Sequence, residues 1–220
     1  MKGMLIKDFQ QLKGMKMNLL LPFLVSFFVM YMSKSSSFFI SYSTMVFNIL
    51  VISTMSYDEY DNGMPFLLSL PVTRKGYVRS KYLLMLITGF LVLAFTFSVS
   101  LLFEHLIIQS ELELADIALM SVGSSIAAFV LILLYLPASF KFGYRKGMFI
   151  MTGIAGFIVV VSIGVAKSGL LEKLAGPLSD MISYFLDHKL LLLGGTFGLL
   201  SLFFFLSYAL SIRFIEKKEY

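Results

Sequence analysis

Few residues of this chain have the types and the spacing that catalysis requires. The two histidines, His105 and His188, are far apart and lack metal-ligand spacing, and the sequence has no cysteine to supply a thiolate ligand. The stretch GVAKSG, residues 164–169, comes nearest to a phosphate-binding loop, but such a loop needs glycine where Val161 and Ala166 stand. The sequence therefore predicts no catalytic residue, no metal site and no ATP hydrolysis by this chain.

The stretch YDEYDNGMPFLLSLPVTRKGYVRSKYLLML, residues 57–86, has the chemistry of a binding segment. Asp61 or Asn62 can cap a short helix that ends before Pro71, and Thr73 can cap a second, longer helix. One or two helical turns are unstable alone in water, so we expect this helix to dock into a groove on a soluble partner or onto lipid headgroups. The candidate contact residues are Asn62, Gly63, Pro65, Phe66, Leu67, Leu68, Ser69, Leu70, Pro71, Arg74 and Lys75.

Long apolar runs position this segment. Hydrophobic residues make up 58% of the sequence, charged residues only 14%, and the mean hydropathy is +0.88, which is typical of an integral membrane protein. About 20 apolar residues of helix cross the hydrocarbon core, and no run shows the alternation of barrel strands. We predict one all-α membrane domain, residues 1–220, with six spans at about 17–33, 38–57, 82–103, 117–140, 147–166 and 190–212.

These spans contain no Asp, Glu, Lys or Arg. Ionisable groups inside a membrane mark proton relays and charged filters. The prediction therefore disfavours a proton-coupled carrier and a channel with a charged filter.

Lysine and arginine are distributed unevenly over the predicted loops. With the N-terminus in the cytoplasm, 14 of the 18 basic residues are cytoplasmic, and Lys34, Lys167, Lys173 and Lys189 lie outside. We therefore predict cytoplasmic N- and C-termini, with residues 57–86 facing the cytoplasm. The positive net charge reflects this asymmetry, and we expect no nucleic-acid partner.

Two further segments are amphipathic. Residues 2–16 carry Leu5, Phe9 and Leu12 on one helical face, as in a helix that lies at the membrane interface. Residues 167–188 are too polar to span but contain apolar residues at helical spacing. We expect the latter to form short extracellular helices between the fifth and sixth spans.

The sequence resembles the ABC-2 type permeases of ATP-binding cassette exporters. The resemblance rests on the order of motifs after the second of six spans: acidic residues, then Asn-Gly, then FLLSLPVTRK, then VRSKYL. Within that family the sequence looks most like the small permeases of the phenol-soluble modulin exporters of staphylococci. The six-span plan covers the whole chain, whereas the specific motif is confined to about residues 57–85.

The resemblance implies that the loop forms a coupling helix and that Phe66 to Leu70 insert into a cleft on a separate cytoplasmic ABC ATPase. It also implies a homodimer, or a heterodimer with a paralogous permease, and ATP with Mg²⁺ on the ATPase, with no cofactor on this chain. The implied location is a bacterial plasma membrane, and the implied cargo is amphipathic, cytolytic peptides. Bacteriocin or drug efflux with self-immunity, and a non-transporting sensor or immunity protein, are the alternatives, and the sequence identifies no substrate-binding residue.

Overall fold

The computed structural model describes residues 2–60, 63–69, 73–108, 114–167 and 189–218, and within these ranges it contains helices and no strand. The helices are α1 (Lys2–Gly14), α2 (Lys16–Ser33), α3 (Ser37–Glu59), α4 (Gly63–Ser69), α5 (Arg74–Phe103), α6 (Leu114–Phe142), α7 (Tyr144–Lys167) and α9 (Lys189–Glu216). A π-helix, η2 (Glu104–Ile108), continues α5 directly.

Four of the described helices are long and apolar enough to cross a membrane. They are α3, α5 with η2 as far as Ile107, α6, and α9 from Gly194 onward. These helices correspond to the second, third, fourth and sixth predicted spans, so the all-helical membrane fold is confirmed. Helices α2 and α7 lie where the first and fifth spans are predicted, and the apolar part of α2, Leu20–Ser33, is shorter.

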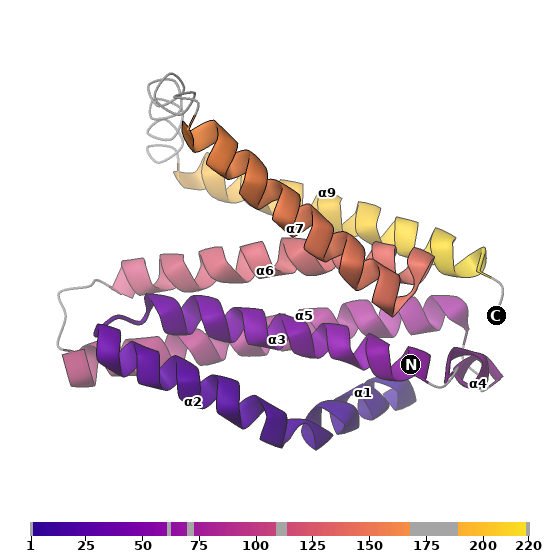
Figure 1. Ribbon diagram of the computed structural model, residues 1–220, viewed down its shortest axis with the longest axis horizontal. Coiled ribbons are helices and arrows are strands. Elements are labelled where there is room, and N and C mark those ends of the chain that lie inside the picture. Colours follow the sequence, from indigo (N-terminus) through magenta and orange to yellow (C-terminus); the bar gives the residue numbers. More distant parts are fainter. Residues whose placement is uncertain (1, 61–62, 70–72, 109–113, 168–188, 219–220) are drawn as a thin grey trace.

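Both chain ends and α4 lie at the same end of the bundle, which we call the α4 end (Figure 1). Helices α3, α5 and α6 pack against one another, α2 packs on α3, and α7 and α9 pack on α6. Toward the opposite end α9 diverges from α6 (Figure 1). The bundle is therefore closed near α4 and more open at its far end.

The core confirms this difference between the two ends. The larger buried cluster joins α1, α3, α4, α5, α6 and α9, whereas the second cluster consists of Met30, Phe39 and Phe103 at the opposite end. In the larger cluster the hydroxyl of Tyr82 on α5 lies 2.6 Å from that of Ser207 on α9. Buried hydroxyls are costly unless they are paired, so this contact fixes α9 against α5.

The turn between α6 and α7 depends on one glycine and on a carboxylate from α3. Gly143 has φ +86°, in the left-handed region that favours glycine. The backbone N–H of Tyr144 donates to Glu59 Oε2 at 2.6 Å, which places a negative charge at the start of α7. Helix α3 therefore positions α7 at the α4 end.

Three charged residues lie next to the predicted spans, within helices that the structure continues past those bounds. Asp58, Lys81 and Glu104 belong to helices that are long and apolar enough to cross a membrane, and they are 3%, 0% and 2% exposed. The predicted spans stop at each charge, but a helix continues through a charge that the protein pairs internally. At the far end, Glu104 accepts hydrogen bonds from the backbone N–H (3.0 Å) and the hydroxyl (2.7 Å) of Ser36, which precedes α3.

Candidate functional site

Helix α4 lies in the loop between α3 and α5, where the sequence predicts a short helix. Met64 and Leu67 are buried in the core of this chain, whereas Pro65, Phe66 and Ser69 are exposed. The interpretation of Leu67 as a residue that reaches toward a partner is therefore corrected, because its side chain holds α4 on the bundle. Phe66, 69% exposed, is a large apolar side chain that α4 presents outward.

Four other candidate residues have no described side chain. Asn62, Leu70 and Pro71 lie outside the described residues, and the structure describes only the backbone of Leu68. Their proposed contacts with a partner stay predictions.

The basic candidates Arg74 and Lys75 bind within the chain. The Arg74 guanidinium donates to the carbonyl oxygens of Ile215 (3.3 Å) and Glu216 (2.9 Å), and the Lys75 ammonium lies 3.2 Å from the Glu216 carboxylate. Basic groups suit the carbonyl-rich end of a helix, so both residues anchor the end of α9 to the start of α5. Thr73 caps α5 by accepting a backbone hydrogen bond at 3.0 Å, which confirms the predicted cap.

A group of four charged residues, three of them buried and the fourth, Lys7, partly exposed, lies where α1 packs against α3 and α5 at the α4 end. Its members are Lys7, Asp8, Asp58 and Lys81, and we call it the four-charge cluster. The Lys81 ammonium lies 2.9 Å from Asp8 Oδ1 and 2.6 Å from Asp58 Oδ2. Lys7 pairs with the same two carboxylates. The cluster thus connects the N-terminal helix to the two helices that α4 joins.

Hydrogen bonds complete the cluster. The Lys81 ammonium also donates to Thr54 Oγ1 at 3.2 Å, and the Tyr77 hydroxyl donates to Asp58 Oδ2 at 3.0 Å. The side chains of Lys81, Asp8 and Asp58 are at most 1% exposed, and the two positive and two negative charges cancel. Buried charges that are paired and hydrogen-bonded in this way are tolerated, but loss of one residue of the cluster leaves an uncompensated buried charge. One oxygen, Asp8 Oδ2, is buried without a hydrogen-bond partner.

The cluster also explains which face α1 presents to the bundle. Met4 and Asp8, one turn apart, are 6% and 0% exposed, whereas Ile6 and Phe9 are 57% and 39% exposed. Leu5, Phe9 and Leu12, the face predicted to lie at the membrane interface, are half-buried or exposed in the chain itself, so their contact with a membrane stays a prediction. Asp8 turns inward because Lys81 supplies the opposite charge.

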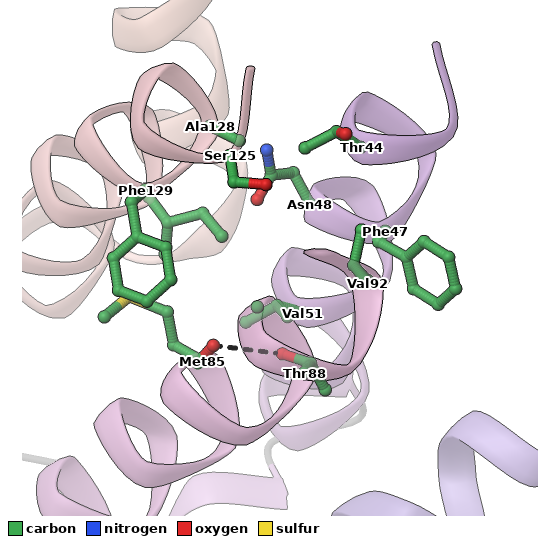
Figure 2. Close-up of a pocket in the computed structure, with 12 residues that line it drawn as sticks. Thr44, Phe47, Asn48, Val51, Met85, Thr88, Val92, Ser125, Ala128 and Phe129 are labelled. Carbon is green, nitrogen blue, oxygen red and sulfur yellow. Dashed lines mark hydrogen bonds between the residues drawn. The ribbon is translucent and has the colours of Figure 1, made fainter. Parts of the chain in front are cut away.

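A small, mostly apolar cavity with four polar lining residues, Thr44, Asn48, Thr88 and Ser125, lies between α3, α5 and α6 and has a volume of about 20 Å³. Figure 2 shows Asn48 and Ser125 directed toward each other across it. The Ser125 hydroxyl is buried and has no hydrogen-bond partner, while the Thr88 hydroxyl bonds to its own helix at the Leu84 carbonyl, 2.7 Å away. A cavity of this size holds about one water molecule, so it is not a cargo site.

The described residues contain no group of three or more metal-ligating side chains. The four-charge cluster offers two carboxylates, and both are bound to lysines. Its chemistry is therefore that of a structural connection between helices and not that of a metal centre or a catalytic pair.

Gly63, the glycine of the Asn-Gly pair, packs closely against the end of α3, and a substitution there tests this contact. A Cβ at this position would lie 2.7 Å from the backbone oxygen of Asp58, which cannot move away as a side chain can. We expect Gly63→Ala to displace α4 and to cost about 1 to 3 kcal/mol of stability, measured by thermal unfolding of the detergent-solubilised protein.

Gly14, at the end of α1, is the matched control because a Cβ there meets nothing within 4 Å. Gly14→Ala should stabilise the helix by up to about 1 kcal/mol or leave it unchanged. Equal unfolding temperatures for Gly63→Ala and the parent would show that α4 does not pack closely on the end of α3.

These features define an all-helical, multi-pass membrane protein whose candidate site connects its helices to a short loop helix. A family model described as "ABC-2 family transporter protein" matches residues 3–216, and the chain belongs to this family. Comparisons with curated proteins and with solved structures gave no match. Family membership makes this chain the membrane component of an ABC transporter, with an ATPase as its partner.

The four-charge cluster is what the sequence interpretation missed. Asp58 and Lys81 flank the loop on either side, and Asp8 shares a helical face with Met4. The sequence did contain one indication of the Asp58–Lys81 pair, because an acid and a base that border the same membrane loop are candidates for pairing. No local pattern, however, indicated that α1 would supply the second carboxylate.

Proposed function

We propose that this chain is the transmembrane permease subunit of an ATP-driven exporter in the bacterial plasma membrane. In this proposal α2 and α7 complete six spans, both termini are cytoplasmic, and α4 is the coupling helix that contacts a cytoplasmic ABC ATPase. The working unit is a homodimer or a heterodimer with a paralogous permease. Family membership and the position of α4 between two spanning helices support this reading.

The observation that carries the proposal is how α4 is tied to the bundle. Met64 and Leu67 enter the core from α4, while Asp58 on α3 and Lys81 on α5 pair at 2.6 Å just beyond the two ends of the loop. A displacement of α4 would therefore move α3 and α5 together. ATP-driven closure of the ATPase would act on Phe66 and tilt this pair of helices as one unit.

The four-charge cluster would extend this motion to α1. Lys7 and Asp8 belong to α1, and both bind the charges of α3 and α5. Because the pairs are buried, separating α1 from α5 would expose unpaired charges to a low-dielectric interior. We therefore expect α1, α3 and α5 to change conformation together.

The proposed cargo is an amphipathic, cytolytic peptide of the phenol-soluble modulin type, with bacteriocin or drug efflux as the alternative within the same class. Exposed aromatic and aliphatic side chains on the described spanning helices suit apolar cargo. Cells that lack this chain should accumulate such peptides and become sensitive to peptides added outside. Unchanged peptide content and sensitivity would remove the peptide proposal and leave the permease proposal standing.

Purification with the partner separates the permease from a non-transporting sensor or immunity protein. The exporter subunit should copurify with an ABC ATPase whose ATP hydrolysis depends on this chain in proteoliposomes. A sensor or immunity protein would bind its partner without changing ATP hydrolysis or moving cargo.

The proposed orientation can be tested by labelling, because the chain has no cysteine of its own. A cysteine replacing the exposed Lys34, in the turn between α2 and α3, should react with an impermeant thiol reagent in intact cells. A cysteine replacing Lys75 at the α4 end should react only after permeabilisation. The reverse pattern would place α4 outside and end its assignment as a coupling helix.

A further inference from the structure

The small cavity between α3, α5 and α6 contains a buried hydroxyl group that the chain itself leaves unpaired. Ser125 lines the cavity and is 7% exposed, and its hydroxyl has no hydrogen-bond partner within the chain. A buried hydroxyl without a partner is costly, because it has lost the hydrogen bonds that it makes in water. Helix α6, which carries Ser125, is long and apolar enough to cross a membrane, so bulk water does not restore these bonds. A bound molecule that pairs with the hydroxyl would remove this cost.

Three further residues bring polar groups to the same cavity. Asn48 on α3 is directed toward Ser125 (Figure 2), and no direct hydrogen bond joins these two described side chains. The hydroxyls of Thr44 and Thr88 donate to carbonyl oxygens of their own helices at 2.6 and 2.7 Å, so both oxygens remain only as acceptors. The lining therefore offers donors on Ser125 and Asn48 and acceptors on the two threonines.

Size and charge limit what can occupy the cavity. Its volume of about 20 Å³ exceeds the roughly 10 to 15 Å³ that one water molecule needs, and it is too small for an organic molecule. Among the described residues no acidic or basic side chain lines it, so a metal ion there would be an uncompensated charge in a low-dielectric interior. The occupant that fits is neutral, the size of one water molecule, and able both to donate and to accept hydrogen bonds.

We propose that this cavity is a binding site for a single water molecule that joins α3, α5 and α6. The water accepts hydrogen bonds from the Ser125 hydroxyl and the Asn48 amide and donates to the threonine oxygens, which gives it the two to four partners typical of buried water. This bridge adds to the long contact of 3.4 Å between the hydroxyls of Thr44 and Ser124, which also joins α3 to α6. The proposal concerns the packing of these three helices and does not depend on how the chain couples to an ATPase.

The sign of a stability change separates a hydrated cavity from a dry one. In a dry cavity, Ser125→Ala would remove an unpaired hydroxyl and would raise the unfolding temperature of the detergent-solubilised protein. With water bound, the same change removes one of the hydrogen bonds of the water and should lower the unfolding temperature by about 2 to 4 °C.

Ser121→Ala is the matched control for this measurement. Ser121 lies one turn before Ser125 on α6, is 0% exposed and also has an unpaired hydroxyl, but it does not line the cavity. Its replacement by alanine should leave the unfolding temperature unchanged or raise it. If Ser125→Ala is as stable as the parent or more stable, or if both variants shift equally, the cavity holds no bridging water and the proposal is wrong.

Magnetic resonance can detect the water directly, because the sequence has only three asparagines. The full chain, with isotope-labelled asparagine, would be reconstituted in vesicles of deuterated lipid, and the side-chain amide signal of Asn48 would be identified by its loss in Asn48→Leu. Magnetisation should pass from water protons to this amide in the parent. It should no longer do so in Ser125→Val, which replaces the hydroxyl with methyl groups and fills the cavity. An Asn48 amide that receives no magnetisation from water, or receives as much in Ser125→Val as in the parent, would overturn the proposal.

Discussion

Replacement of Lys81 by methionine is expected to destabilise the protein by about 3 to 5 kcal/mol and to abolish export. The side chain is 0% exposed and sits between the carboxylates of Asp8 and Asp58. Methionine keeps the length and the apolar stem but leaves two buried carboxylates with only Lys7 to compensate them. The effect should appear as a large drop in the unfolding temperature of the detergent-solubilised protein and as loss of cargo export from cells.

Two further variants test whether uncompensated charge causes the loss of stability in Lys81→Met. One is a matched surface variant, and the other restores the balance of charge. Lys75 also pairs with a carboxylate, that of Glu216, but its side chain is 66% exposed, so Lys75→Met should cost no more than about 1 kcal/mol. The double variant Asp8→Asn with Lys81→Met keeps the pair of Lys7 with Asp58 and should regain much of the lost stability. If the double variant is no more stable than Lys81→Met, the loss reflects packing and not charge.

Phe66→Asp is expected to separate the permease from its ATPase while leaving the bundle folded. Phe66 is 69% exposed on α4, so its replacement removes no contact from the core. Loss of one buried phenylalanine contact at the interface should cost about 2 to 3 kcal/mol, or about 30- to 150-fold in affinity. Copurification of the ATPase and ATP hydrolysis that depends on this chain should both fall, with normal expression and unfolding temperature.

The next residue provides the contrast. Leu67 is 9% exposed in the core, so Leu67→Asp should lower expression and stability, the opposite of what an outward-facing leucine would do. Phe66→Leu keeps an apolar side chain at the proposed interface and should retain most of the ATPase binding. If Phe66→Asp copurifies the ATPase as well as the parent does, α4 is not the contact and the proposed route from ATPase to bundle is wrong.

The sequence by itself determined the class of the protein and much of its secondary structure. Apolar runs long enough to cross a membrane identified α3, α5, α6 and α9, because the length that crosses hydrocarbon is a local property of the chain. The short helix α4 and the Thr73 cap of α5 were likewise predicted, because prolines and capping residues act on their immediate neighbours. The order of motifs around this loop also indicated the family. The match of the family model to residues 3–216 then established it.

Only the tertiary structure decided which charges are buried and which leucine faces inward. Asp8 and Lys81 are 73 residues apart, and Lys7 and Asp58 are 51 apart, so no local pattern links them. Burial of a charge depends on whether a distant helix supplies the opposite charge, and the same sequence without that helix would leave each charge in water. The inward direction of Leu67 is decided in the same way, since the core that receives it is assembled from α1, α3, α5, α6 and α9.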